Sequence, residues 1–277
     1  MSIPAILINT CDTYLDVLEI QLELLEKHGY FDQSGLKVYV NTETKTLEKY
    51  SDHETVIFHK NGFKAWGERV RSSLKIIDST YVLCLFDDYF PETNFDKNAY
   101  FDLLNAVSLK NMDCCYLAPL LKRKDKDSRS DYGLFRINDL RPYRLNSMAA
   151  VWSITTLLTV LKDHDDPWSW EAFGGYRPEA RNLKIWSVSE ASPFQYVYSF
   201  QSGGAVYRGG WAQSVLDRLG LMSHPIIMSS ERPVHKTLES TSRSIVWKIK
   251  FLAKGFSISK SGVFKFIFSS IKAKYFG

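Results

Sequence analysis

The sequence lacks several features that would place it in large classes of protein. It contains no run of 18 apolar residues, so no membrane-spanning helix is expected. Neither a GxxxxGK[ST] loop nor a GxGxxG motif is present, which argues against NTP hydrolysis and dinucleotide redox chemistry. A GxSxG motif is absent too, and a Ser or Cys nucleophile is therefore unsupported.

Cysteine is scarce, and its positions exclude a common metal site. Cys11, Cys84, Cys114 and Cys115 contain no CxxC pair, so a structural zinc site is not expected. The six His residues show no ligand spacing either. Because the N-terminal residues lack the basic segment and cleavage site of a secretion signal, we expect reduced thiols and a cytoplasmic location.

Acidic residues are almost absent from the end of the chain. Residues 235–277 contain nine Lys and Arg but only one acid, Glu239. The preceding 234 residues contain 26 Lys and Arg against 30 Asp and Glu, a net charge of −4. This asymmetry predicts two parts, a main domain over residues 1–234 and a basic segment over residues 235–277.

Apolar runs alternate with helical patterns through the first half of the sequence. The runs predict strands at residues 5–8, 36–40, 81–86 and 114–117. Apolar residues at helical spacing predict helices at residues 15–28, 63–77 and 96–110. This alternation is typical of the α/β class, with a Rossmann-type, mostly parallel central sheet and helices on both faces.

Polar residues follow two of these strands at their carboxyl ends, where such sheets bind ligands. The first strand is followed by Asn9, Thr10 and Asp12, and the third by Asp87 and Asp88. A carboxylate pair together with a substrate diphosphate satisfies the oxygen preference of Mg²⁺ or Mn²⁺. An Asp-Asp turn that caps the next segment is the alternative.

The second half of the sequence has a less regular pattern. The charged segment Lys122–Ser130 is predicted to be a surface loop. Beyond it, five Trp residues lie among Gly and Pro, and we expect this half to build the acceptor side of a cleft: Trp152, Trp168, Trp170, Trp186 and Trp211. Such rings serve either as platforms for sugars or simply as core, and the sequence leaves both open.

Several short motifs resemble, in order and spacing, the bacterial GT-A-fold glycosyltransferases that build capsule, O-antigen and lipopolysaccharide sugars. They are Ile6-Leu-Ile-Asn9-Thr10-Cys11-Asp12, Trp66-Gly-Glu68-Arg69, Phe86-Asp87-Asp88-Tyr-Phe90, Asn146-Ser-Met-Ala-Ala-Val-Trp152, Asp166-Pro-Trp-Ser-Trp-Glu171 and Val206-Tyr-Arg208-Gly209-Gly-Trp211. The resemblance covers residues 3–220. It implies a nucleotide-sugar donor, a Mn²⁺ or Mg²⁺ cofactor and a glycan or lipid-linked oligosaccharide acceptor.

The resemblance also implies roles for individual residues. Asn9, Thr10 and Asp12 would line the nucleotide pocket. Asp87 and Asp88 would take the place of the family's Asp-x-Asp metal motif, and Asp88 would be catalytic. The pair is adjacent here and Tyr89 fills the third place, a departure from the family pattern that leaves the direct metal ligand open.

Two arginines are further candidates for the donor site. Arg69 is offset from the apolar stripe of its predicted helix and could reach a phosphate; the alternative is a solvated charge. Arg208, in a Gly-flanked loop, could meet the leaving diphosphate.

Glu171 is the candidate catalytic base. A carboxylate held among Trp168, Trp170 and Phe173 would be partly desolvated, which raises its pKa and its basicity. The alternative is a cap or salt bridge at a surface turn, and Asp166 is the reserve candidate. Because one base and no carboxylate nucleophile are found, we expect direct displacement with inversion.

The basic segment has a helical pattern in which apolar and basic residues alternate. One face carries the apolar residues Ile245, Ile249, Leu252 and Phe256. The opposite face carries the basic residues Arg243, Lys250 and Lys254. Basic amphipathic segments bind anionic membrane surfaces, which predicts an enzyme at the inner face of the cytoplasmic membrane. A helical lid packed on the main domain is the alternative, and nucleic acid fits least because the main domain is acidic.

The sequence therefore predicts a metal-dependent, inverting glycosyltransferase. Two alternatives stay open: a nucleotidyltransferase, and a non-catalytic glycan-binding or assembly protein on a degenerate version of the same fold. The first would normally carry a Gly-rich, basic loop after the first strand, where this chain has Asn9-Thr-Cys-Asp12.

Overall fold

The computed structural model describes residues 5–118, 133–188, 194–197, 203–237 and 243–276. The predicted surface loop Lys122–Ser130 lies outside the described residues. The strands are β1 Ala5–Asn9, β2 Val38–Thr42, β3 Val56–Lys60, β4 Tyr81–Phe86, β5 Cys114–Tyr116, β6 Leu134–Ile137, β7 Ala150–Ser153, β8 Ile185–Val188, β9 Val206–Tyr207, β10 Gly210–Ala212 and β11 Val234–His235. The α-helices are α1 Leu15–Lys27, α2 Trp66–Lys75, α3 Lys97–Leu109, α4 Ile154–Val160, α5 Pro167–Phe173, α6 Gln213–Leu219, α7 Pro225–Ser229, α8 Ile245–Ile258 and α9 Lys260–Phe276.

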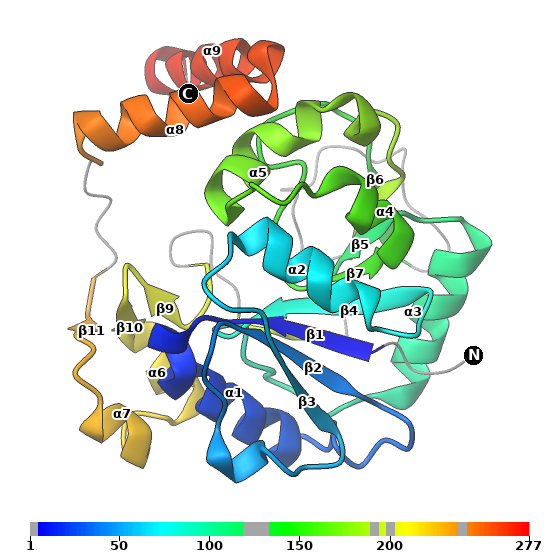
Figure 1. Cartoon of the computed structure of the whole chain (residues 1–277), viewed down its shortest axis with the longest axis vertical. Helices are drawn as coiled ribbons and strands as arrows, with labels where there is room; N and C mark the ends of the chain where they lie inside the picture. The colour runs from blue at the N-terminus through cyan, green and yellow to red at the C-terminus, as the bar shows by residue number, and fades with distance from the viewer. Residues whose placement is uncertain (1–4, 119–132, 189–193, 198–202, 238–242, 277) are drawn as a thin grey trace.

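Eight strands form one central sheet in the order β3-β2-β1-β4-β7-β5-β8-β6 (Figure 1). The strands β3, β2, β1 and β4 run parallel to one another, and β5 and β8 form a second parallel pair. Strands β7 and β6 run antiparallel to the strands beside them. The predicted α/β class with a mostly parallel central sheet is confirmed, and the second half of the sheet is mixed.

Helices cover the sheet because its central strands are apolar on both sides. Ile6, Leu7 and Ile8 of β1 are all buried, as expected for a strand between two layers. Helix α1 joins two cores: Leu18 packs against the central sheet, and Ile20 packs against the small sheet β11-β10-β9 and α6. The small sheet therefore stands beside the first strands of the large one.

The first half matches the predicted pattern closely, with three differences. Strand β2 begins at Val38 rather than residue 36, and helix α2 begins at Trp66, which leaves Phe63 outside it and 80% exposed. Strand β3 was not predicted. It is a partly buried edge strand, and its apolar run Val56-Ile57-Phe58 is short and is followed by His59 and Lys60.

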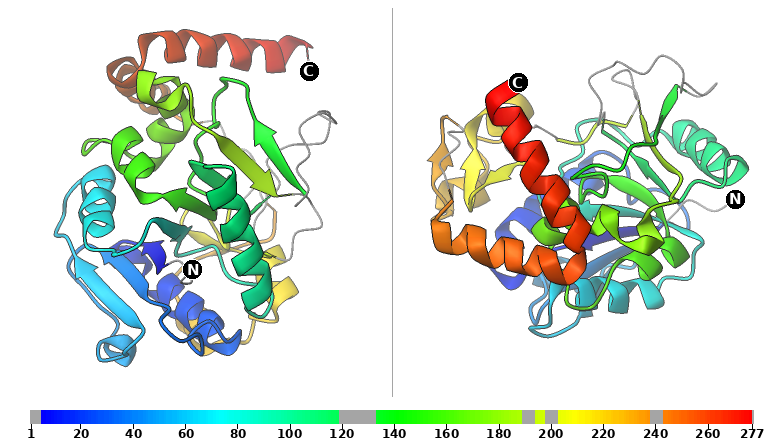
Figure 2. Two further views of the ribbon diagram at one scale, coloured as in Figure 1. Left: turned by 90° about the vertical axis from the view of Figure 1, so that its right-hand side faces the viewer. Right: turned by 90° about the horizontal axis from the view of Figure 1, so that it is seen from above.

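The C-terminal segment is helical, as predicted. Helices α8 and α9 form a hairpin across one end of the molecule (Figures 1 and 2). Strand β11 pairs with β10, so the predicted boundary between residues 234 and 235 falls inside a strand of the small sheet. No helix in the described part of the chain is long and apolar enough to span a bilayer.

Candidate functional site

The acidic pair lies where the order of the parallel strands reverses. From β1 the chain adds β2 and β3 on one side and β4 on the other, which makes the β1–β4 gap the switch point of the sheet. Asn9 and Phe86, the last residues of these strands, are register partners. The next residues, Thr10 and Asp87, are joined by a hydrogen bond of 2.5 Å from Thr10 Oγ1 to Asp87 Oδ2. The predicted donor residues thus meet at the position where such sheets bind ligands.

Both carboxylates of the acidic pair are desolvated. Asp87 is only 5% exposed, and burial together with the charge of Asp88 raises the pKa of Asp87 well above its usual range. Burial raises the pKa of Asp88 to about 6. Asp87 is buried and Asp88 is half-buried, and two adjacent desolvated carboxylates repel each other, so the site favours a cation or a proton.

Gly204 allows the chain to pass directly over Asp88. A Cβ placed on Gly204 would lie 2.4 Å from both the carbonyl oxygen and a carboxylate oxygen of Asp88. The backbone N–H of Ala205 donates to the Asp88 carbonyl at 2.8 Å. A residue far along the chain thereby closes one side of the acidic pair, and sequence reasoning did not identify it.

Arg232 is a second residue near the acidic pair that the sequence did not indicate. Its guanidinium forms a two-point ion pair with Asp16, with N–O distances of 2.6 and 2.9 Å, and lies 4.2 Å from the centroid of the Tyr14 ring. Its positive charge opposes the rise in the pKa of Asp87. Burial and, to a lesser extent, the charges of Asp87 and Asp88 raise the pKa of Tyr14. Arg232 therefore lies within electrostatic range of the acidic pair.

A row of buried amides runs along the carboxyl ends of the first three strands. The Asn41 amide donates to Asn9 Oδ1 at 2.9 Å, and the Asn61 amide donates to Asn41 Oδ1 at 3.0 Å. Asn9 itself donates to the carbonyl of Leu85 at 3.3 Å. The predicted role of Asn9 at a nucleotide stays a prediction, and its side chain visibly ties β1 to its neighbours.

Asp12 holds the loop that follows β2. Its carboxylate accepts hydrogen bonds from the backbone N–H groups of Thr44 at 3.0 Å and Lys45 at 3.1 Å. Although desolvation opposes the effect, these bonds and that of the Thr44 hydroxyl lower the pKa of Asp12. Asp12 therefore shapes the rim of the site, and contact with a nucleotide stays a prediction.

Arg69 points into the site from α2. It is 6% exposed, so the interpretation as a solvated helix charge is wrong. Its Nη1 donates to the carbonyl of Thr10 at 2.8 Å, and its Nη2 lies 3.9 Å from the Glu43 carboxylate. This places a buried positive charge behind the residue that bonds Asp87.

Glu171 lies on helix α5, which begins at the N-cap Asp166 followed by Pro167. The backbone N–H of Ser147 donates to Glu171 Oε1 at 2.7 Å, and the Ser147 hydroxyl donates to the same oxygen. Burial raises the pKa of Glu171, and these two bonds oppose the rise. The carboxylate is thus oriented and desolvated, as a general base requires.

The reserve candidate Asp166 caps helix α5 and forms an ion pair. Its carboxylate accepts from the Ser169 N–H at 2.9 Å and pairs with Lys254 of α8. Although burial alone would raise the pKa of Asp166, the bonds from Lys254 and Ser169 lower it. Asp166 caps α5 and is the weaker base.

The aromatic surroundings predicted for Glu171 need a correction. Trp170 and Phe173 are 2% and 0% exposed and belong to the core, so they offer no face to an acceptor sugar. They are buried because they lie on the side of α5 that faces the molecule, whereas Trp168 is 60% exposed. Trp152 and Trp211 are buried as well, and the core interpretation holds for them.

A small cavity lies beneath the carboxyl ends of β1 and β4, next to Trp170 of α5. Its volume is about 20 Å³, enough for one water molecule, and its lining includes Asn9, Phe86 and Ser147. Phe86 directly precedes the acidic pair, and Ser147 binds Glu171. The cavity therefore lies between the residue that precedes the acidic pair and the residue that binds Glu171.

Arg208 occupies the turn between β9 and β10. Arg208 and Gly209 have φ values of 51° and 84°, and the flanking residues Tyr207 and Gly210 are register partners, as in a two-residue hairpin. The Arg208 side chain is exposed and lies 5.3 Å from the centroid of the Tyr207 ring. The Gly209 carbonyl accepts from Arg232 at 2.9 Å, which connects this turn to the site.

The acidic pair can supply only part of a metal coordination shell. No group of three or more His, Cys, Asp or Glu suited to a metal exists in the described residues. Hard divalent cations accept one or two carboxylates and complete their shell with substrate phosphates and water. The residues present therefore fit a cation that arrives with, or is completed by, a diphosphate.

No protein-family model and no curated protein matches the sequence. Solved structures with a similar arrangement include S. aureus TarS 1-349 in complex with UDP-GlcNAc, at 15% identity and a TM-score of 0.48 over 94% of this chain and 74% of that chain. The glycosyltransferase GlyE of Streptococcus pneumoniae aligns at 11% identity with a TM-score of 0.36, over 56% of this chain and 35% of that chain. HddC from Yersinia pseudotuberculosis aligns at 11% identity with a TM-score of 0.44, over 70% of this chain and 92% of that chain. The chain spans 36% of another solved TarS chain.

Proposed function

We propose that this chain is a glycosyltransferase that moves a sugar from a nucleotide-sugar donor to a hydroxyl of a glycan carried on a lipid. The observation that carries the proposal is the desolvated pair Asp87 and Asp88 at the switch point between β1 and β4. Parallel sheets bind nucleotides at this position, and paired carboxylates there suit a cation on a diphosphate.

Asp87 and Asp88 would hold Mn²⁺ or Mg²⁺. When bound, the ion would neutralise charge on the departing diphosphate. Thr10 fixes the orientation of Asp87 through its 2.5 Å hydrogen bond. Gly204 lets the backbone pass close to Asp88 and cover one side of it. Arg69 would contribute positive charge beneath the same strand ends.

Glu171 would act as the general base. In the proposed step the acceptor oxygen attacks the anomeric carbon, the bond from that carbon to the diphosphate oxygen breaks, and Glu171 takes the hydroxyl proton. A single displacement of this kind inverts the anomeric configuration. The backbone N–H of Ser147 orients the carboxylate by donating to one of its oxygens at 2.7 Å. Because burial raises the pKa of Glu171, the carboxylate is suited to accepting a proton.

Capsule, O-antigen or lipopolysaccharide sugars would be the product class, made at the cytoplasmic face of the membrane. This finer assignment follows the motif resemblance, whose Asp166–Glu171 element coincides with the capped start of α5. It is the part of the proposal that donor and acceptor screening must define.

Nucleotide release from a panel of sugar donors tests the proposal. We expect wild-type protein with Mn²⁺ to release nucleoside diphosphate from one donor, and that diphosphate to raise the melting temperature only with Mn²⁺ present. Asp88→Asn should lower release about a hundredfold or more, because a metal contributes several kcal/mol of transition-state stabilisation. Asp102→Asn, at an exposed helix position, is the matched control.

Two outcomes would count against the proposal. Binding of nucleoside diphosphates without release from any donor would favour a glycan-binding or assembly protein. Sugar-phosphate-dependent release of pyrophosphate from an NTP would favour a nucleotidyltransferase.

A further inference from the structure

The α8–α9 hairpin is attached to the main domain through one apolar face. Phe173 of α5, Phe251 of α8, and Val263 and Phe266 of α9 form a separate hydrophobic cluster. Gly255 permits the close approach, since a Cβ there would lie 2.7 Å from the Phe173 ring. The packed-helix interpretation of this segment is thus correct for one side of the hairpin.

The other side of the hairpin exposes apolar side chains. Nine of the eighteen large hydrophobic residues that are exposed in the described parts of the chain lie within residues 245–271. They are Ile245, Val246, Trp247, Ile249, Phe256, Phe264, Ile267, Phe268 and Ile271. Half of these exposed residues lie in this short segment, and such a concentration of exposed apolar side chains marks an interaction surface.

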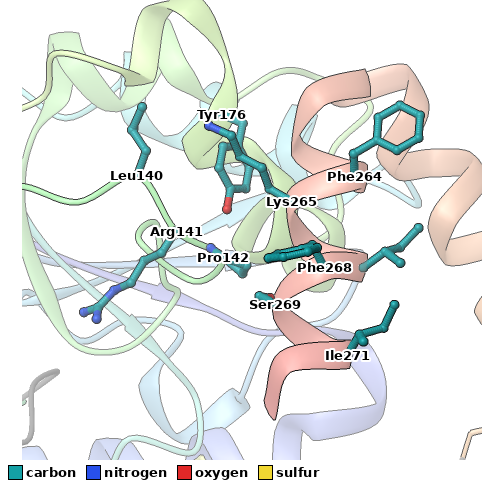
Figure 3. A pocket seen from close by; sticks show the side chains of 10 residues that line it. Leu140, Arg141, Pro142, Tyr176, Phe264, Lys265, Phe268, Ser269 and Ile271 are labelled. Atoms are coloured by element: carbon teal, nitrogen blue, oxygen red, sulfur yellow. The ribbon is translucent and has the colours of Figure 1, made fainter. Parts of the chain in front are cut away.

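A shallow groove of about 660 Å³ continues this patch toward the main domain. Figure 3 shows Lys265 and Phe268 of α9 pointing toward Tyr176 and Pro142 across the groove. The Lys265 amine lies 5.3 Å from the centroid of the Tyr176 ring. Apolar side chains with a basic rim therefore extend from the hairpin onto its neighbours.

The charge of the hairpin has one sign. Residues 243–277 contain eight Lys and Arg and no Asp or Glu. Lys248, Lys250, Lys260 and Lys265 are exposed, and Lys254 pairs with Asp166 of α5. A surface that exposes both apolar and basic side chains complements a lipid bilayer, whose apolar interior is bordered by negatively charged headgroups.

We propose that the α8–α9 hairpin docks on the surface of a lipid bilayer that contains anionic lipids. Its exposed aromatic and aliphatic side chains enter the interface, and its lysines bind lipid phosphates. The right-hand view of Figure 2 shows both helices in front of the rest of the molecule, so they can meet a flat surface together. The proposal does not depend on sugar transfer.

Two other occupants fit the observations less well. A second copy of the hairpin would bring eight like charges against eight others, which opposes a symmetric dimer. Nucleic acid would pair with the lysines, but its phosphate backbone offers no partner for side chains such as Phe264 and Phe268, exposed by 65% and 71%. Lipid is the occupant that satisfies both kinds of group.

Co-sedimentation of the full chain with vesicles tests the proposal. We expect pelleting with phosphatidylcholine vesicles that contain phosphatidylglycerol, weaker pelleting with phosphatidylcholine alone, and a decline as salt is raised. Replacing Lys250 and Lys260 by Gln should lower the partition coefficient about 30-fold, since each basic residue contributes about 1 kcal/mol. Lys27→Gln with Lys75→Gln, also exposed, is the control and should bind as the wild type does.

A second variant tests the apolar contribution. The triple variant Ile249→Ser, Phe264→Ser, Phe268→Ser removes apolar side chains that are 62–71% exposed. It should lower the partition coefficient at least about tenfold. The control replaces three equally exposed residues elsewhere, with fractions of 73–80%: Phe63, Leu109 and Met228. Melting temperatures of all variants should match the wild type, because none of these side chains lies in a core cluster.

Three results would overturn the proposal. They are absence of pelleting with every vesicle, equal binding by the Ser variant and its control, and a wild-type dimer in sedimentation velocity that only the Ser variant loses. The last would assign the patch to a second copy of the chain.

Discussion

Two regions of this molecule reverse the usual distribution of side chains, in opposite directions. At the strand ends polar groups are buried: Asn41 is 0% exposed and Asp87 is 5% exposed. On the α8–α9 hairpin apolar groups are exposed, Phe268 by 71%. Burial of an unneeded carboxylate and exposure of an unneeded aromatic both cost free energy, so each reversal marks a surface at which a ligand is expected.

The two regions differ in how their side chains are held. Single hydrogen bonds fix the strand-end groups, such as Thr10 to Asp87 and Asn41 to Asn9. The exposed hairpin face consists of many similar side chains, none of which requires a specific partner. We therefore expect one-atom changes to abolish function at the first region, and only combined changes to do so at the second.

Glu171→Gln sharpens this comparison most. It replaces one oxygen by nitrogen, keeps an acceptor for Ser147, and removes the proposed base. We expect the transfer rate to fall about 10²–10⁴-fold while the affinity for nucleoside diphosphate stays unchanged. Steady-state transfer kinetics and calorimetric binding check the two halves of this statement.

The pH profile separates a base from a structural carboxylate. Because burial raises the pKa of Glu171, the transfer rate should increase as pH rises through that raised value, and the Gln variant should lose this dependence. A raised pKa in the folded state also means that Glu171 adds stability only at low pH and loses it as pH rises through the folded-state pKa. The Gln variant should therefore be at least as stable at neutral pH, and Glu179→Gln, exposed and paired with Lys162, should leave the transfer rate and its pH dependence unchanged. A rate that stays within threefold of wild type, with its pH dependence intact, would remove Glu171 from the mechanism.

Gly204→Ala probes how closely the acidic pair is enclosed. The added methyl group would lie 2.4 Å from the backbone oxygen of Asp88, so strand ends or loop must shift. We expect a loss of about 1–3 kcal/mol in the free energy of unfolding, together with weaker Mn²⁺-dependent release. At Gly175, a Cβ would meet its nearest atom at 3.5 Å, an ordinary contact, and Gly175→Ala should be neutral in urea denaturation. Equal stability of the two variants would show that the chain does not press on Asp88.

The parts of the fold that are set by local sequence were predictable. Strand β4 spans Tyr81–Phe86 as expected, since its apolar run ends abruptly at Asp87 and Asp88. The periodic patterns of α1 and α3 predicted those helices for the same reason: each buries one face against the sheet. From such elements the position of the acidic pair at a strand end followed directly.

The residues that complete the site could not be predicted in this way. Arg232 and Gly204 approach Asp87 and Asp88 from distant segments, and nothing in their local sequence distinguishes them from loop residues. The role of Trp170 could not be decided from sequence, because an aromatic next to a candidate base fits a core and a sugar platform equally well. Only packing decides which side of α5 faces inward.

The smallest expected effect concerns the connection between the two regions. Lys254 of α8 pairs with Asp166, the N-cap of α5, and their side chains are 36% and 28% exposed. Asp166→Asn removes the charge but keeps a good N-cap for Ser169, and Lys254→Met removes the other partner. Each change should cost about 0.2–1 kcal/mol or less, measured as faster hydrogen exchange in α8, and added salt should diminish the difference.

The double variant distinguishes an electrostatic connection from an apolar one. If the Phe173, Phe251 and Phe266 cluster holds the hairpin, the double variant should lose no more stability than either single variant, because one ion pair is removed in all three. Phe251→Ala should then open α8 far more than any of them, since it removes a large apolar group from that cluster. A loss beyond about 2 kcal/mol from Lys254→Met alone would contradict this view. It would mean that one polar contact governs the hairpin, and the contrast between a region held by single bonds and one held by collective apolar contact would no longer stand.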